Sequence, residues 1–126
     1  MRFSNAFRAV AGLLMLFVVI FAARAQDTRC KDTATTAAMR ACENSRYESA
    51  DQALNAEYAR LMRQLSPSRQ RRLSEAQRTW VAFRTANADF LASAAEGGSL
   101  APLIKVTALA DMTEARIAEL RTWAKQ

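Results

Sequence analysis

Apolar positions recur at steps of three and four residues along most of the chain, and this pattern predicts helices. Ser66-Pro67 divides the pattern, because Ser66 suits the N-cap of a helix and Pro67 suits its first position. Before this break, one helix face carries Tyr47, Ala50, Leu54, Tyr58, Leu61 and Leu65. A separate short helix is predicted over 33–44, where alanines favour helix.

A third helical segment is predicted over 67–95, and a last one follows the Gly97-Gly98 pair. The stripe of the third segment consists of Leu73, Ala76, Gln77, Trp80, Phe83, Asn87, Phe90 and Leu91. Gly97 or Gly98 is expected to end this helix in the left-handed conformation, and Ser99 is expected to cap the next. The stripe of the last helix consists of Leu103, Val106, Ala110, Ile117 and Leu120, with Trp123 near its end.

No segment alternates with period two, so no strand is expected. The predicted fold class is all-α: an antiparallel bundle of three long helices plus a short N-terminal helix.

The first 25 residues have the three zones of a bacterial signal peptide. Arg2 and Arg8 precede an apolar run over 9–23, and Ala23-Arg24-Ala25 stands before Gln26. A retained membrane anchor is the alternative, but a spanning helix needs about 20 apolar residues. We expect 1–25 to be cleaved, leaving a periplasmic or secreted domain over 26–126 with no membrane association.

Removal of the signal peptide changes the charge of the chain. The whole chain has 18 Lys and Arg against 12 Asp and Glu, a net charge of +6. Without Arg2, Arg8 and Arg24, the balance is 15 against 12, or +3. This mild excess in an exported domain does not indicate a nucleic-acid partner.

The 2 cysteines, Cys30 and Cys42, predict one disulfide, because exported domains fold in an oxidising compartment. The alternatives are a metal site or a redox pair. A metal site would need more ligands, and the chain has 0 histidines. Redox cysteines are usually two residues apart. We therefore expect neither a metal nor another cofactor.

The residue types needed for most enzymatic mechanisms are missing. Without histidine, Ser-His-Asp and Cys-His catalysis are excluded. Gly97-Gly98 is an isolated pair and not a phosphate-binding loop. The carboxylates are spread singly over the predicted helices, so a glycosidase pair is not indicated. The sequence therefore predicts a protein that is not an enzyme.

Two sets of polar residues are candidates for a functional site. The first follows one face of two predicted helices: Tyr47, Asp51, Asn55, Tyr58, Gln77, Trp80 and Arg84. It can form a network between helices, in which Asp51 or Asn55 accepts from Arg84 or Gln77, or it can bind a partner. The second is an exposed basic turn of Arg69, Arg71 and Arg72, for which simple solvation is the alternative.

The spaced residues of this chain resemble a known family. Its pattern reads Met39-x-x-Cys42, then Tyr47-x-x-Ala50-Asp51-x-x-Leu54-Asn55-x-x-Tyr58-x-x-Leu61, then Leu73-x-x-x-Gln77-Arg78-x-Trp80-x-x-Phe83-Arg84, and finally Thr113-x-x-Arg116-x-x-x-Leu120. This pattern is similar to the N-terminal domain of LprI-like lysozyme inhibitors. Members usually have a second cysteine pair, whose places here hold Ala88 and Ala108. The third and last helices must therefore rely on packing alone.

The resemblance implies a protein partner, either lysozyme or another peptidoglycan-lytic enzyme, whose activity the domain would inhibit. The basic turn could offer a cation to the two carboxylates in the cleft of such an enzyme. The net charge of +3 opposes this, because a basic inhibitor gains no electrostatic steering toward a basic enzyme. The alternative is a non-catalytic envelope module for binding or assembly, with no lysozyme inhibition.

Overall fold

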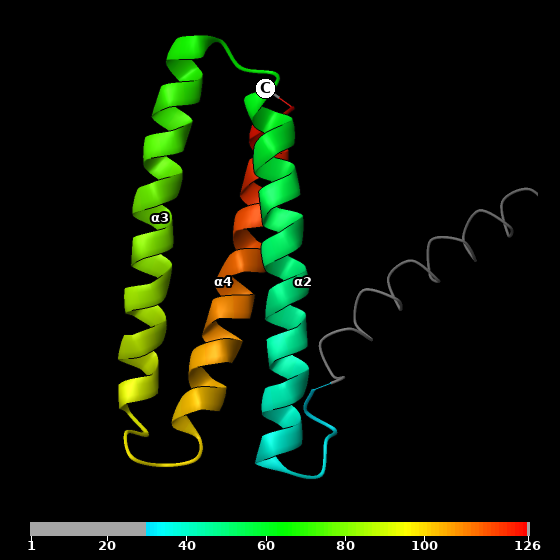
Figure 1. Ribbon diagram of the computed structural model, residues 1–126, viewed down its shortest axis with the longest axis vertical. Coiled ribbons are helices and arrows are strands. Elements are labelled where there is room, and N and C mark those ends of the chain that lie inside the picture. Colours follow the sequence, from blue (N-terminus) through cyan, green and yellow to red (C-terminus); the bar gives the residue numbers. More distant parts are fainter. Residues whose placement is uncertain (1–29, 126) are drawn as a thin grey trace, which may run out of the picture.

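The computed structural model describes residues 30–125, which form three long helices joined by two short connections (Figure 1). The helices are α2 (Thr36–Met62), α3 (Pro67–Ser93) and α4 (Ala101–Trp123). Within the described range there is no strand, so the all-α prediction is confirmed. Successive helices run antiparallel, and α2 and α4 therefore run in the same direction. The predicted signal peptide lies outside the described residues.

The first two predicted helices form a single helix, α2. Its N-cap is Thr35, whose side chain accepts a hydrogen bond from the backbone N–H of Ala38 at 3.1 Å. The separate short helix over 33–44 was therefore a wrong prediction. No glycine or proline occurs between Thr36 and Met62, so nothing in the backbone interrupts the helical hydrogen bonds.

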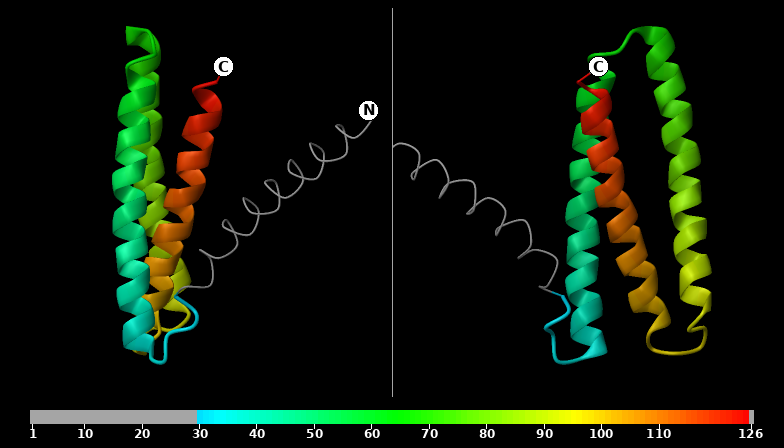
Figure 2. Two further views of the ribbon diagram at one scale, coloured as in Figure 1. Left: turned by 90° about the vertical axis from the view of Figure 1, so that its right-hand side faces the viewer. Right: turned by 180° about the vertical axis from the view of Figure 1, so that it is seen from behind.

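The central helix of the bundle is α4. It packs against both α2 and α3, whereas α2 and α3 make few direct contacts. Figure 2 shows α4 inclined to the other two helices. The main hydrophobic core consists of Ala50, Leu54, Leu61, Leu73, Ile117 and Leu120. Burying each leucine side chain stabilises the fold by about 1.5–3 kcal/mol, so this cluster holds the bundle together.

The face that α3 buries is narrower than its sequence pattern predicted. Its buried residues are Leu73, Arg84 and Ala88, while Phe83 is 57% exposed and Phe90 is 73% exposed. Leu91, another member of the predicted stripe, is also exposed. The prediction that these three side chains face the core was wrong. The physical reason is that α3 is covered mainly by α4, so an aromatic flank remains open to solvent.

The connection between α2 and α3 is fastened by a glutamine side chain. Ser66 is the N-cap of α3 as predicted, but its side chain makes no capping bond. Instead, the Gln70 amide donates to the carbonyls of Met62 and Leu65, each at 3.0 Å, and ties the end of α2 to α3.

At the other connection, Gly97 has a φ of +79°, the left-handed conformation that the sequence predicted for Gly97 or Gly98. Ser99 does not cap α4, because Leu100 occupies the N-cap position and the helix begins one residue later than expected.

The disulfide between Cys30 and Cys42 is present, with 5.5 Å between the two Cα atoms. It fastens the segment before α2 to the second turn of that helix, and Thr33 Oγ1 donates to the Cys30 carbonyl at 2.9 Å. No second disulfide occurs among the described residues. Ala88 in α3 and Ala108 in α4 are both buried, so small side chains fill these places.

Candidate functional site

A buried arginine on α3 connects all three helices. Arg84 is only 6% exposed, and its Nη1 donates to Asp51 Oδ1 in α2 and to Thr113 Oγ1 in α4, both at 2.9 Å. Thr113 in turn donates to the Leu109 carbonyl at 2.6 Å, which fixes its hydroxyl. The arrangement satisfies a charge that would be costly to bury without a partner.

Aromatic rings complete the surroundings of Arg84. Its guanidinium carbon lies 5.4 Å from the centre of the Tyr47 ring and 5.0 Å from that of Trp80. Such cation–π contacts stabilise a desolvated guanidinium. Arg84 Nε is buried and has no hydrogen-bond partner among residues 30–125.

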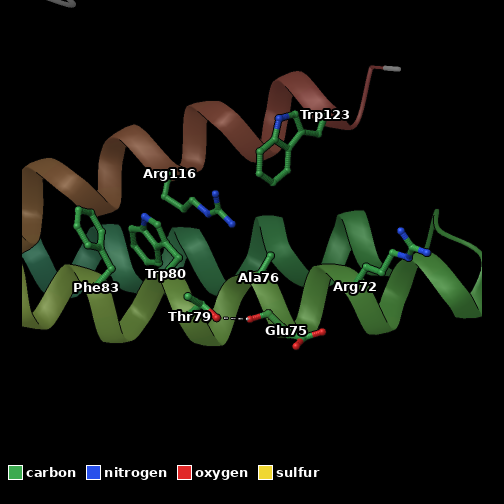
Figure 3. Close-up of a pocket in the computed structure, with 8 residues that line it drawn as sticks. All are labelled: Arg72, Glu75, Ala76, Thr79, Trp80, Phe83, Arg116 and Trp123. Atoms are coloured by element: carbon green, nitrogen blue, oxygen red, sulfur yellow. Dashed lines mark hydrogen bonds between the residues drawn. The ribbon is translucent and has the colours of Figure 1, made fainter.

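A second buried arginine, Arg116 on α4, shares Trp80 with the first. Its Nε donates to Gln77 Oε1 at 3.1 Å and its Nη1 to Glu119 Oε2 at 2.8 Å. Its guanidinium carbon lies 5.5 Å from the centre of the Trp80 ring and 4.7 Å from that of Trp123. Figure 3 shows Arg116 between the two tryptophans. Two arginines and two tryptophans thus form a continuous layer between α3 and α4.

The polar residues predicted from sequence are divided between these two arrangements. Tyr47, Asp51, Trp80 and Arg84 lie together, whereas Gln77 binds Arg116 and does not reach Asp51. Asn55 is exposed and lies 3.5 Å from Asp51 Oδ2, at the limit of a hydrogen bond.

Tyr58 packs against the hydrophobic core, next to the place where α2 and α3 separate. A groove of about 480 Å³ opens there between the two helices, and Asp51, Asn55, Tyr58, Gln77 and Arg84 are all among its lining residues.

Sequence reasoning did not assign a site role to Thr113, Arg116 or Trp123. The first two stand three residues apart, and both also stand in the pattern that resembled the known family. The available signal was their spacing. Thr113, Arg116 and Leu120 follow one another at steps of three and four residues, and residues so spaced share a helix face.

The three arginines of the basic turn lie on two different sides of α3. Arg69, Arg71 and Arg72 are exposed and form no ion pair with any residue that the structure describes. Arg69 and Arg72 line a hollow of about 360 Å³ that includes Trp123. Arg71 instead lines a groove with Arg78 on the side where α2 meets α3. The end of the bundle is therefore positive on two sides.

A compact charge cluster lies on the opposite half of the molecule, between α2 and α4. The Arg46 guanidinium binds Glu43 at 3.0 Å, Asp111 at 2.6 Å, and both oxygens of Glu114 at 2.8 and 2.6 Å. The hydrogen bonds that Arg46 donates to Glu114, and then those to Asp111 and Glu43, raise its pKa above the ordinary value, against the lowering effect of burial. With three carboxylates on one arginine, this surface is negative.

The charged side chains of the networks are engaged with each other, and no group of histidine, cysteine and acidic residues in 30–125 could hold a metal ion. No helix of the described part is long and apolar enough to cross a membrane. The described surface presents exposed aromatic rings, arginines that form no ion pair, and the acidic cluster around Arg46.

Comparison with known proteins identifies the family of the chain. The family model described as "Lysozyme inhibitor LprI" matches residues 28–120. The chain belongs to this LprI family. The match includes the disulfide, all of α2 and α3, and α4 as far as Leu120. Both arginine networks, apart from Trp123, therefore lie within the part that matches the LprI family.

A relative from Rhizobium meliloti (strain 1021) is described as an uncharacterized protein. It is 25% identical over 130 residues, which cover 90% of this chain and 94% of the relative. No solved structure matches the chain. The LprI family match thus carries the functional information, and at family level it indicates a lysozyme inhibitor and not an enzyme.

Proposed function

We propose that the protein is an exported, non-catalytic inhibitor that binds a peptidoglycan-lytic enzyme of the lysozyme type. The observation that carries this proposal is the LprI family match over residues 28–120. The signal-peptide pattern over 1–25 supports export and a working domain over 26–126. Export would bring the domain to the compartment in which such enzymes attack the wall.

The basic turn is the part of the surface that we assign to the enzyme. Lysozymes use two carboxylates in a cleft, and exposed arginines have the complementary charge. Arg69, Arg71 and Arg72 are available for this contact, because they form no ion pair within the described part of the chain. Guanidinium groups bind carboxylates through paired hydrogen bonds.

The distribution of charge bears on the objection that a domain of net charge +3 repels a basic enzyme. The acidic cluster around Arg46 is separated from the basic turn, because it lies near the start of α2 and in the middle of α4. A partner with a basic surface and an acidic cleft could meet both regions in one orientation. Local complementarity of this kind governs association more than net charge does.

The proposal is tested by a lysis assay on a suspension of cell walls with lysozyme and increasing amounts of the purified protein. We expect lysis to slow progressively with the molar ratio. The triple variant Arg69→Ala, Arg71→Ala, Arg72→Ala should inhibit less. Arg40→Ala is a matched control, because Arg40 is exposed on α2 far from the turn, and it should inhibit as well as the parent.

A second measurement, titration of the protein with the enzyme in the absence of walls, identifies what is bound. Saturable binding to the enzyme supports the proposal. Unchanged lysis at a large molar excess would refute inhibition. Slowed lysis without any binding to the free enzyme would refute an enzyme-directed mechanism and would favour a module that binds the wall or another envelope component.

A further inference from the structure

An aromatic groove lies between α3 and α4, and the function proposed above assigns no role to its aromatic rings. It has a volume of about 570 Å³, and its lining includes Trp80, Phe83 and Trp123 (Figure 3). At Trp123 and Arg72 it continues into the hollow of about 360 Å³ beside the basic turn. The two together form one elongated channel along the surface of α3. We refer to it as the tryptophan groove.

The tryptophan groove is open and its rings are already in place. Phe83 is 57% exposed and Trp123 is 37% exposed. Exposed apolar side chains gathered in one concave place are typical of binding sites. Arg116 lies against both tryptophans and is itself held by Gln77 and Glu119. Because Arg116 holds the two tryptophan rings in place, a ligand would lose little free energy in ordering them.

Polar groups lie along the same groove and limit the chemistry of its occupant. Arg72, Glu75 and Thr79 are exposed lining residues on α3. Arg72 and, in the adjoining hollow, Arg69 form no ion pair with residues 30–125. A purely apolar occupant, such as an acyl chain or the apolar face of a helix, would remove these charges from water without providing partners, which is unfavourable.

We propose that the tryptophan groove binds a saccharide chain whose sugars bear carboxylates. The apolar C–H faces of pyranose rings pack against indole and phenyl rings. Their hydroxyl and amide groups can donate to the Glu75 carboxylate and to Thr79 Oγ1, which itself donates to the Glu75 carbonyl at 3.1 Å, and a carboxylate on the sugar can accept from Arg72 and Arg69. The groove thus combines rings for stacking, polar groups beside them and, at one end, arginines that form no ion pair. An acidic glycan can contact all three.

The test compares two tetrasaccharides by calorimetric titration of the purified protein, with no enzyme present. One is a neutral N-acetylglucosamine tetramer, and the other alternates N-acetylglucosamine with N-acetylmuramic acid, so that only the second bears carboxylates. We expect saturable binding of the acidic glycan at an affinity about tenfold above that of the neutral one, since one charge-assisted hydrogen bond contributes about this factor.

Variants assign the binding to the groove. Arg72→Ala should lower the affinity for the acidic glycan about tenfold and leave that for the neutral glycan unchanged. Trp123→Ala should weaken binding of both glycans. Phe90→Ala is the control for an exposed aromatic outside the groove, and Arg40→Ala is the control for an exposed arginine. Both controls should bind like the parent, and circular dichroism verifies that each variant is folded.

Several results would overturn the proposal. These are no saturable binding of either glycan, equal affinity for the two, or unchanged binding of the acidic glycan by the folded Arg72→Ala variant. Since the titration contains no lytic enzyme, its failure leaves the inhibitor function standing. Conversely, glycan binding by a protein that does not bind the enzyme would support this inference while the inhibitor function failed.

Discussion

Arg84 of α3 donates a hydrogen bond to Asp51 of α2 over 2.9 Å, although these two helices make few other contacts. The same Nη1 atom also reaches Thr113 of α4. One buried side chain thus sets the position of α3 relative to both neighbours. Apolar contacts alone allow several registers between helices, whereas a buried polar network is satisfied in only one.

We therefore expect Arg84→Ala to lower the free energy of unfolding by roughly 1–3 kcal/mol. The variant leaves Asp51 without its cation and removes the contacts with the Tyr47 and Trp80 rings. The estimate stays below that for a fully buried ion pair, because the Asp51 side chain is 39% exposed and can be solvated. Denaturant unfolding followed by circular dichroism measures the change.

The matched control is Arg78→Ala on the same helix. Arg78 is exposed and forms no ion pair with the described residues, so its replacement should change stability by no more than about 0.5 kcal/mol. Equal stability of the Arg84→Ala and Arg78→Ala variants would mean that the network is not a stabilising element.

Arg46 should be a second stabilising position, through a different mechanism. Arg46→Gln leaves Glu43, Asp111 and Glu114 close together without a cation. We expect a loss of about 1–2 kcal/mol, mainly from Glu43, because Asp111 and Glu114 are largely exposed and repel each other weakly through water. Thermal melts at low salt measure this loss.

Added salt should reduce the loss, since it screens the repulsion between the three carboxylates. Arg40→Gln serves as the control and should melt like the parent at every salt concentration. An Arg46→Gln penalty that does not depend on salt would indicate lost packing of the side chain instead of electrostatic repulsion.

The helices could be predicted from sequence because their signals are local. Ser66-Pro67 located the start of α3, and the Gly97-Gly98 pair located the turn between α3 and α4. The separate helix over 33–44 was wrong because no glycine or proline follows Asn44 to end it, and the helical hydrogen bonds continue to Met62. The exposed positions of Phe83 and Phe90 depend on which neighbour covers α3, and this is a tertiary property.

The candidate site was predictable only in part for the same reason. Asp51 and Arg84 could be placed on facing stripes by their spacing. Their partner Thr113 is 29 residues from Arg84, and Gln77 pairs with Arg116 across 39 residues. Gln77 binds Arg116 on α4 and does not reach Asp51 on α2, and this choice depends on how far α2 and α3 lie apart. Periodicity carries no information on that distance.

Glu57 should make stability depend on pH on the acid side. Its carboxylate accepts from Arg121 at 3.0 Å and from Arg60 at 2.9 Å, and these bonds hold its pKa below the ordinary value of 4.5. The folded state therefore favours the ionised form. Its stabilising contribution is complete above pH 4.5 and is lost as the pH falls through the pKa of the folded state.

Melting temperatures between neutral pH and the acid limit of folding test this effect. The parent should lose stability on acidification more steeply than Glu57→Gln, in which the titrating group is absent. Glu48→Gln is the control, because Glu48 is exposed on the same helix and forms no ion pair with the described residues. Parallel pH curves for the parent and Glu57→Gln would contradict the assignment.

The places of the missing disulfide offer a test of how α3 and α4 pack. Ala88 and Ala108 are buried on these two contacting helices, so we expect Ala88→Cys with Ala108→Cys to form a bridge. It should raise the melting temperature under oxidising conditions, with a stabilisation of up to roughly 3 kcal/mol. The single variant Ala88→Cys is the control. Two titratable thiols in the folded double variant would show that these Cα atoms are too far apart.

The native disulfide gives the last prediction. Cys30 and Cys42 are the 2 cysteines of the chain, so a reductant acts on this bond alone. Reduction should lower the free energy of unfolding by roughly 3 kcal/mol, the loop-closure value for a loop of about this length. The helices should remain folded, because the main hydrophobic core begins at Ala50 and includes neither cysteine. The far-ultraviolet circular dichroism spectrum should therefore remain helical while the melting temperature falls.

A variant with Cys30→Ala and Cys42→Ala should melt like the reduced parent and should not respond to reductant. If reduction left the melting temperature of the parent unchanged, the bridge would not contribute to stability, and its role would be confined to the segment before α2.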